Sequence, residues 1–438
     1  MPVKVEPEYF KKHIMWLTGM GINVIPVDNV WYKWIYKLYS VIILTYVFLY
    51  FVLEVIDTVK SVNFTSMMFG LCHTVTHILA LVKMILLIVK KKNVRNMLLK
   101  LESKYFKPNM ERGGEEEFRL INSAIKRANI HAEVFKYIAL SIIGSRGLFA
   151  IFDKGTYVEV LNEEYNITEY RHMRTLPYKA WFPTDLNKSP AYELMFVYQI
   201  SCLTLYGLYI GFVDAVIYGL MFHMTMQYII LNKVLQNCVH IARNIAEKKQ
   251  SGECVLDRNI KYVGQPGNME NVPLESNHLQ DVLQDVVNYC ARYHLDIIHF
   301  CDDIENEFCY LVLSQFLSSL YILCFLLFQL SVMPSYLSFE FISMCLYLFL
   351  MMYQLFCFCW YGNELMLRSW QFSLDIYESE WLVANNKIKK SLLLMMMRCQ
   401  RPAKFTAGKF AIISLETYVT VVRASASYFM VLKQMNQA

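Results

Sequence analysis

The sequence predicts an all-α membrane protein with seven transmembrane helices and a cytosolic N-terminus. Of its 438 residues, 56% are hydrophobic and only 18% are charged, whereas a soluble domain carries roughly 25% charged residues. Seven largely apolar stretches recur along the chain, each near the length of about 20 residues that crosses a bilayer. Lysine and arginine are also distributed unequally between the segments that join these stretches, which indicates how the helices are oriented.

The seven predicted spans are separated by more polar segments. The third and seventh spans are less apolar than the others, because Arg146 lies in the third and Glu416 and Arg423 lie in the seventh. We expect the Arg146 side chain to extend outward along its helix to the membrane surface. The spans are expected at residues 36–55, 64–89, 134–152, 194–221, 310–333, 339–361 and 405–432.

Basic residues indicate that the N-terminus is inside. With that orientation the inner segments contain 29 lysines and arginines, and the outer segments contain 7. Cytosolic loops carry such an excess. The three Asn-x-Ser/Thr sequences, at Asn63, Asn166 and Asn187, all fall in outer segments. These asparagines are the predicted glycosylation sites, because the modification occurs only on the lumenal side.

The predicted spans divide the chain into membrane and cytosolic parts. We expect a cytosolic N-terminal segment at 1–35, spans one to four with ligand-pocket elements at 36–221, cytosolic anchor helices at 222–309 with a flexible loop at 250–275, spans five and six at 310–361, further anchor helices at 362–404, and the seventh span with an extracellular C-terminus at 405–438.

Several predicted helices are too long for the membrane alone. Residues 274–333 contain no glycine and no proline, so one helix of about 90 Å is expected there, against a hydrocarbon thickness of about 30 Å. Spans four and six also continue with helical periodicity, and residues 387–398 form another helix before Pro402. Extensions of spans 4, 5, 6 and 7 therefore predict a cytosolic helical bundle. The pattern favours a bundle that joins subunits over one confined to a single chain.

The sequence indicates neither an enzyme nor a metal or cofactor site. It has no phosphate-binding loop, no dinucleotide fingerprint and no His-Glu-x-x-His motif. Cys290, His294, His299 and Cys301 cannot all converge on a metal from one helix. A net charge of +5 is too small to indicate nucleic acid binding. None of the twelve cysteines lies in an outer segment, so no extracellular disulfide framework is expected.

The last span has a pattern that suits a pore. Ser427, Val431 and Gln434 share one helix face by their spacing. In a pore they would offer a hydroxyl, a hydrophobic constriction and an amide ring in succession. On spacing alone, an ordinary packed helix explains the pattern better.

The C-terminal third carries a family resemblance. Tyr-Phe-Met-Val-Leu-Lys-Gln at 428–434 resembles the final pore-lining segment of the insect odorant receptors. The stretches 359–365, 402–409 and 414–416 are similar to the same family. The resemblance implies a tetrameric, ligand-gated, non-selective cation channel with the N-terminus inside, in the plasma membrane of a sensory dendrite. It implies three partners: a co-receptor subunit, a small hydrophobic odorant or pheromone, and membrane lipid. The insertion before span five is shorter than in the co-receptor, so this chain resembles the odorant-tuning subunit.

The same resemblance implies site residues. Val431 takes the place of the hydrophobic gate and Gln434 that of the filter, with Ser427 on the same face, while Lys433 departs from the co-receptor pattern. The odorant pocket is expected in the outer half, between spans two, three, four and six. Its residues are Ser141, Gly144 and Leu148 by family spacing and, by depth, Ile78, Leu81, Phe196, Leu203, Met344 and Tyr347.

Two alternative functions remain open. The gustatory receptors share a related C-terminal pattern and imply a homotetrameric channel. A receptor coupled to G proteins would need its N-terminus outside, against the distribution of basic residues, and the chain contains neither Asp-Arg-Tyr nor Asn-Pro-x-x-Tyr.

Overall fold

Long α-helices dominate the structure, a computed structural model. It describes residues 8–24, 29–61, 63–152, 156–162, 167–184, 186, 188–250, 277–333 and 338–437. The helices are α1 (Lys11–Gly19), α2 (Val30–Lys60), α3 (Phe64–Leu101), α4 (Met110–Phe152), α5 (Ala191–Gln236), α6 (Cys238–Gln250), α7 (Asn277–Val332), α8 (Phe339–Tyr377), α9 (Asn386–Cys399) and α10 (Leu415–Gln437). The predicted all-α class is confirmed.

Short strands accompany the helices. The hairpin of β1 (Thr156–Asn162) and β2 (Ile167–Met173) is antiparallel and lies in the predicted outer segment between spans three and four. A much smaller hairpin, β3 (Thr406–Ala407) with β4 (Ala411–Ile412), precedes α10. The sequence analysis anticipated neither hairpin.

The first six predicted spans lie within helices that can cross a membrane. Among the described residues, six helices are long and apolar enough to do so: α2, α3, α4, α5, α7 and α8. The predicted start of the seventh span at Phe405 was wrong, because its helix begins only at Leu415. Gly408 and Lys409 both have a φ of 66°, a left-handed conformation that turns the chain instead of continuing a helix.

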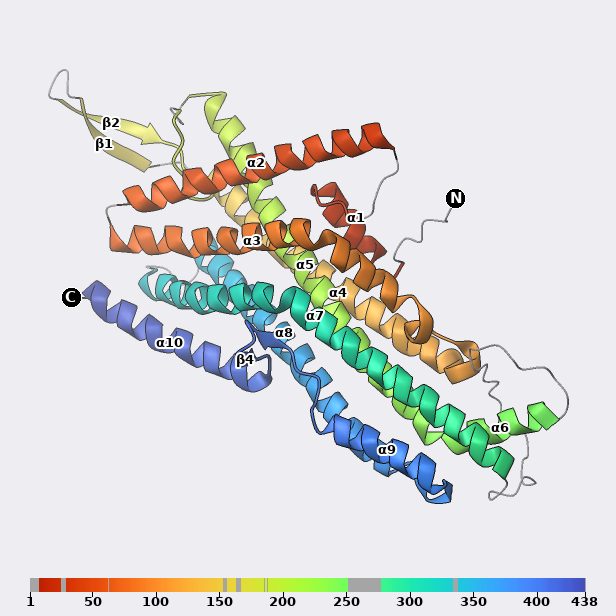
Figure 1. The fold of residues 1–438 in the computed structure, drawn as a ribbon. Coiled ribbons are helices and arrows are strands. Elements are labelled where there is room, and N and C mark those ends of the chain that lie inside the picture. The colour runs from red at the N-terminus through yellow and green to blue at the C-terminus, as the bar shows by residue number, and fades with distance from the viewer. Residues whose placement is uncertain are drawn as a thin grey trace.

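The long helices project together beyond the apolar region. Residues Asn277–Val332 form one uninterrupted helix, as the missing glycine and proline predict. In Figure 1, α4, α5, α7 and α8 run side by side toward the end of the molecule where α6 and α9 pack. The extension of span four breaks at Asn237, between α5 and α6. The predicted loop at 250–275 lies outside the described residues, apart from Gln250 at the end of α6.

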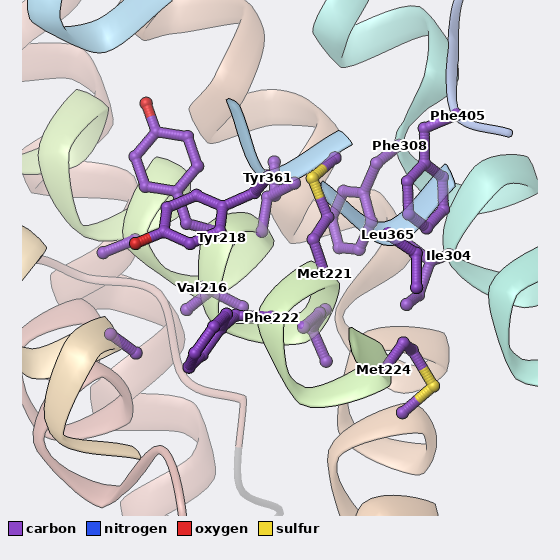
Figure 2. Packing of buried hydrophobic residues seen from close by; sticks show 14 of the residues in the cluster. Val216, Tyr218, Met221, Phe222, Met224, Ile304, Phe308, Tyr361, Leu365 and Phe405 are labelled. Atoms are coloured by element: carbon purple, nitrogen blue, oxygen red, sulfur yellow. The ribbon is translucent and has the colours of Figure 1, made fainter. Parts of the chain in front are cut away.

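Helix α5 forms the centre of the bundle. Every residue from Tyr209 to Tyr228 is buried, as expected of a helix enclosed on all sides. Figure 2 shows α5 side chains, including Tyr218 and Met221, among residues of α7, α8 and the segment before β3. Gly219 allows close approach to α4, because a Cβ there would lie 2.9 Å from the Ala128 Cβ. A central, buried α5 provides the surface against which the surrounding helices pack.

Candidate ligand cavity and buried polar network

A cavity of about 70 Å³ lies between α3, α4, α5 and α8. Enclosing one water takes about 10–15 Å³, so the space is larger than a site for a single water. Its apolar lining includes Phe135, Ala139, Ile142, Ile143, Leu203 and Ile210. Its polar lining consists of His73, Thr76, His77, Tyr178, Tyr206 and Tyr347. A mostly apolar wall with a few convergent polar groups is typical of small-molecule sites.

Helical spacing explains how the cavity forms. On α4, Phe135, Ala139 and Ile142 follow each other at intervals of four and three residues and therefore share a face. Two small residues leave the space open: Ala139 on α4 and Gly207 on α5, whose Cβ, if present, would lie 3.4 Å from the Ala139 Cβ.

Hydrogen bonds hold the α3 wall of the cavity. The Thr76 hydroxyl donates to the Cys72 carbonyl at 3.0 Å, and it also contacts the Tyr347 hydroxyl on α8. The His73 Nδ1 lies 3.0 Å from the Phe69 carbonyl oxygen. These bonds fix the orientation of each polar side chain toward the space between the helices.

A buried pair connects the cavity wall to α2. The His77 Nδ1 lies 2.6 Å from the Glu54 Oε2. The Glu54 side chain is buried, and the His77 ring stacks on Tyr206 with centroids 4.3 Å apart. Glu54 therefore holds the His77 ring through this hydrogen bond, although Glu54 itself does not line the cavity.

The structure brings only part of the predicted pocket together. Leu203 and Tyr347 line the cavity. Leu81 and Met344 are buried and Phe196 half-buried, but none of the three lines it. Four predicted residues lie on exposed helix faces instead: Ser141, Gly144, Leu148 and Ile78. On α4 the cavity is lined by their neighbours Ile142 and Ile143, because each step along a helix rotates the side chain by about 100°.

The predicted pore residues share an uncovered face of α10. Ser427, Val431 and Gln434 are all exposed, as is Lys433. The opposite side of α10 is attached to α7, where the Ser425 hydroxyl donates to the Leu320 carbonyl at 3.1 Å. The roles of these residues stay predictions. Of the predicted glycosylation sites, Asn63 is exposed at the start of α3, whereas Asn166 and Asn187 lie outside the described residues.

A buried ion pair that the sequence analysis missed lies among the apolar helices. The Lys83 Nζ on α3 is 2.6 Å from the Asp214 Oδ1 on α5 and 2.6 Å from the Gln315 Oε1 on α7. The Gln354 amide on α8 donates to the other Asp214 oxygen. All four side chains are at most 1% exposed. This polar network therefore joins four helices at one point, and its buried charges are paired within the protein.

The polar network lies one turn beyond the cavity. Asp214 follows the cavity residue Ile210 on α5, and Gln354 follows Leu350 on α8, each by four residues. Charges inside apolar spans mark functional positions in membrane proteins, and this signal could have found Lys83 and Asp214 from the sequence. The sequence analysis considered Arg146 instead, which the structure places 3.5 Å from Glu340 at the start of α8.

Comparisons with known proteins identify a family and a fold. Residues 63–426 match the sequence model of the 7tm odorant receptor family. Odorant receptor Or2 of Anopheles gambiae is 28% identical over 263 residues, covering 60% of this chain and 61% of the relative. Odorant receptor 10 of Aedes albopictus is 28% identical over 269 residues, with 60% and 61% covered. The matched region thus spans about three fifths of these relatives.

A solved structure has the same fold over nearly the whole chain. The insect olfactory receptor OR5 from Machilis hrabei, in complex with eugenol, superposes with a TM-score of 0.74 at 14% identity, covering 98% of both chains. A second structure of that receptor gives 0.73 at 15% identity with the same coverage.

Proposed function

Because the chain belongs to the 7tm odorant receptor family, we propose that it is the odorant-binding subunit of a ligand-gated, non-selective cation channel. The observation that carries the proposal is the mostly apolar cavity between α3, α4, α5 and α8. A small hydrophobic volatile molecule is the ligand that such a space admits. Binding opens the channel to the extent that the ligand prefers the open state.

The pore is lined by α10. Within one chain this helix packs mainly on α7 and α8, and its apolar residues Tyr428, Met430, Val431 and Met435 are each more than half exposed. Such side chains require covering by lipid or by another subunit. When four copies of α10 surround one axis, Val431 forms the hydrophobic gate and Gln434 forms the filter. Ser427 lies on the same face. Ions then cross the plasma membrane with the N-terminus on the cytosolic side.

An uncovered apolar surface supports assembly through the cytosolic helices. This surface, on α8 and α9, consists of Leu367, Trp370, Leu374, Leu393, Leu394 and Met397, all about half exposed or more. It lies on the extensions beyond the apolar spans, where water would otherwise cover it. Many large exposed apolar side chains in one region favour an interaction site, and therefore joined subunits over a bundle confined to one chain. A co-receptor subunit is the partner in a heterotetramer.

Replacing Leu394 with glutamate is expected to prevent assembly and leave the single chain folded, because the side chain is 66% exposed and contributes little to its own core. Subunit counting in detergent should give mostly monomers. Asn122→Asp adds one negative charge at an exposed site on α4 instead and should assemble normally. Wild-type assembly of Leu394→Glu would contradict the interface.

Current recordings test the proposed function directly. Cells expressing the chain with a co-receptor should show ligand-evoked cation currents, and cells expressing the chain alone should show none. Currents of full size from the chain alone would favour a gustatory-type homotetramer. Currents that disappear when G proteins are blocked would contradict the channel and favour a G-protein-coupled receptor.

A further inference from the structure

Most hydroxyl groups around the cavity already donate their hydrogen to another group of the protein. The Tyr206 hydroxyl donates to the Val47 carbonyl at 2.5 Å. The Thr76 hydroxyl donates to the Cys72 carbonyl at 3.0 Å, so the Tyr347 hydroxyl that contacts Thr76 must be the donor in that pair. Each hydroxyl has only one hydrogen to give. None of these three hydroxyls therefore has a hydrogen left for a ligand.

His73 leaves an acceptor facing no protein partner. Its Nδ1 is bonded to the Phe69 carbonyl, and a carbonyl can only accept, so the hydrogen of the neutral ring is on Nδ1. The Nε2 atom then carries a lone pair. Among the residues that the structure describes, no hydrogen bond reaches this atom. Covering such an acceptor with a ligand that does not pair with it costs free energy.

Tyr178, whose ring packs against His73, carries an unused donor. Its ring packs edge-on against His73, with centroids 5.0 Å apart, and both residues line the cavity. The Tyr178 hydroxyl has no hydrogen-bond partner within the described part of the chain. The backbone of Tyr178 is clamped by Gln199, whose amide accepts from its N–H at 3.1 Å and donates to its carbonyl at 2.9 Å. The phenol is thus held in place at the cavity wall.

We propose that the cavity selects molecules that carry a hydroxyl group, an alcohol or a phenol, on an otherwise apolar body. The ligand hydroxyl donates to the His73 Nε2 and accepts from the Tyr178 hydroxyl, while the rest of the ligand lies against Phe135, Ile142 and Leu203. An ether, ketone or ester can only accept and leaves the His73 Nε2 unpaired. This inference rests on the proposed odorant-binding function and specifies its ligand class.

Pairs of isomers isolate the hydroxyl group. 1-Hexanol and methyl pentyl ether have the same atoms, as do 4-methylphenol and methoxybenzene. Wild-type receptor with co-receptor should respond to each hydroxyl compound at a concentration about 10- to 100-fold lower than to its ether, the difference expected for one buried hydrogen bond. In His73→Phe, which keeps a flat ring against Tyr178, this preference should fall to within about threefold. Surface labelling and thermal unfolding at wild-type levels show that the variant is folded.

Tyr178→Phe provides a second test, because it removes only the donor and should reduce the preference in part. Equal potency of the two isomers in the wild type, or a preference for the ether, would overturn the inference. A preference that survives intact in both variants would also overturn it.

Ligand-induced thermal stabilisation of the purified chain separates this inference from the proposed function. Stronger stabilisation by the hydroxyl isomers without any evoked current would support the ligand class and contradict the channel. Evoked currents with no preference for the hydroxyl isomers would support the channel and contradict the ligand class. No stabilisation by any of the four compounds would overturn the ligand class.

Discussion

Ala139→Leu is expected to reduce the sensitivity of the receptor to its ligand by about 100-fold or more, since filling a ligand site removes most of the binding free energy. Ala139 is 7% exposed and lines a cavity of about 70 Å³. The three added carbons occupy space that the ligand needs. Concentration–response curves for the evoked current, with surface labelling to confirm expression, measure the effect.

Ser141→Leu is the matched control for Ala139→Leu. Ser141 lies two residues further along α4, on its exposed face, so similar added bulk there should change the response by less than about twofold. The two variants also test which face of α4 contacts the ligand, the face of Ala139 or the face of Ser141. A loss of response in Ser141→Leu, with a normal response in Ala139→Leu, would restore the pocket implied by family spacing and refute the cavity as the binding site.

Lys83→Met is expected to lower the stability of the chain by about 3–5 kcal/mol, the cost of breaking a buried ion pair by removing one partner. The substitution leaves the Asp214 carboxylate, 1% exposed, without its counter-ion. It also removes the hydrogen bond that the Gln315 Oε1 accepts from Lys83. Thermal unfolding in detergent and the amount of receptor at the cell surface should both decrease sharply.

The double variant Lys83→Met with Asp214→Asn should recover most of that loss. It removes both charges, and the asparagine keeps an oxygen for the Gln354 amide, which donates to Asp214 in the native chain. Replacing both members of a buried pair is often neutral or stabilising. Lys83→Met at wild-type stability, or a double variant no better than the single one, would show that the ion pair contributes little.

Hydropathy and length were sufficient to predict six spans and the long α7. Each span is an apolar stretch of the right length, and α7 contains no residue that would interrupt a helix. The start of the seventh helix could not be found in this way. Phe405 and Ile413 are apolar because they are buried in protein beside the β3–β4 hairpin, and an apolar side chain does not indicate whether protein or lipid surrounds it.

The cavity was harder to predict for a related reason. Ile142 lines it and Leu148 is exposed, yet both are aliphatic, so polarity cannot distinguish the cavity face of α4 from the lipid face. Family spacing names Ser141, whose side chain is exposed, whereas its neighbour Ile142 lines the cavity. The Lys83–Asp214 pair depends on two residues that no local pattern relates, because only the packed fold brings them together.

The distance between Lys83 and Asp214 along the chain, 131 residues, has a consequence for biosynthesis. A chain is made from its N-terminus, so α3 reaches the membrane before its counter-ion in α5 has been synthesised. A lysine within a span opposes insertion, by up to about 2.5–3.5 kcal/mol at the centre of the span. Until α5 has been made, Lys83 is without its counter-ion. A chain truncated before α5 would therefore keep this uncompensated charge in its second span.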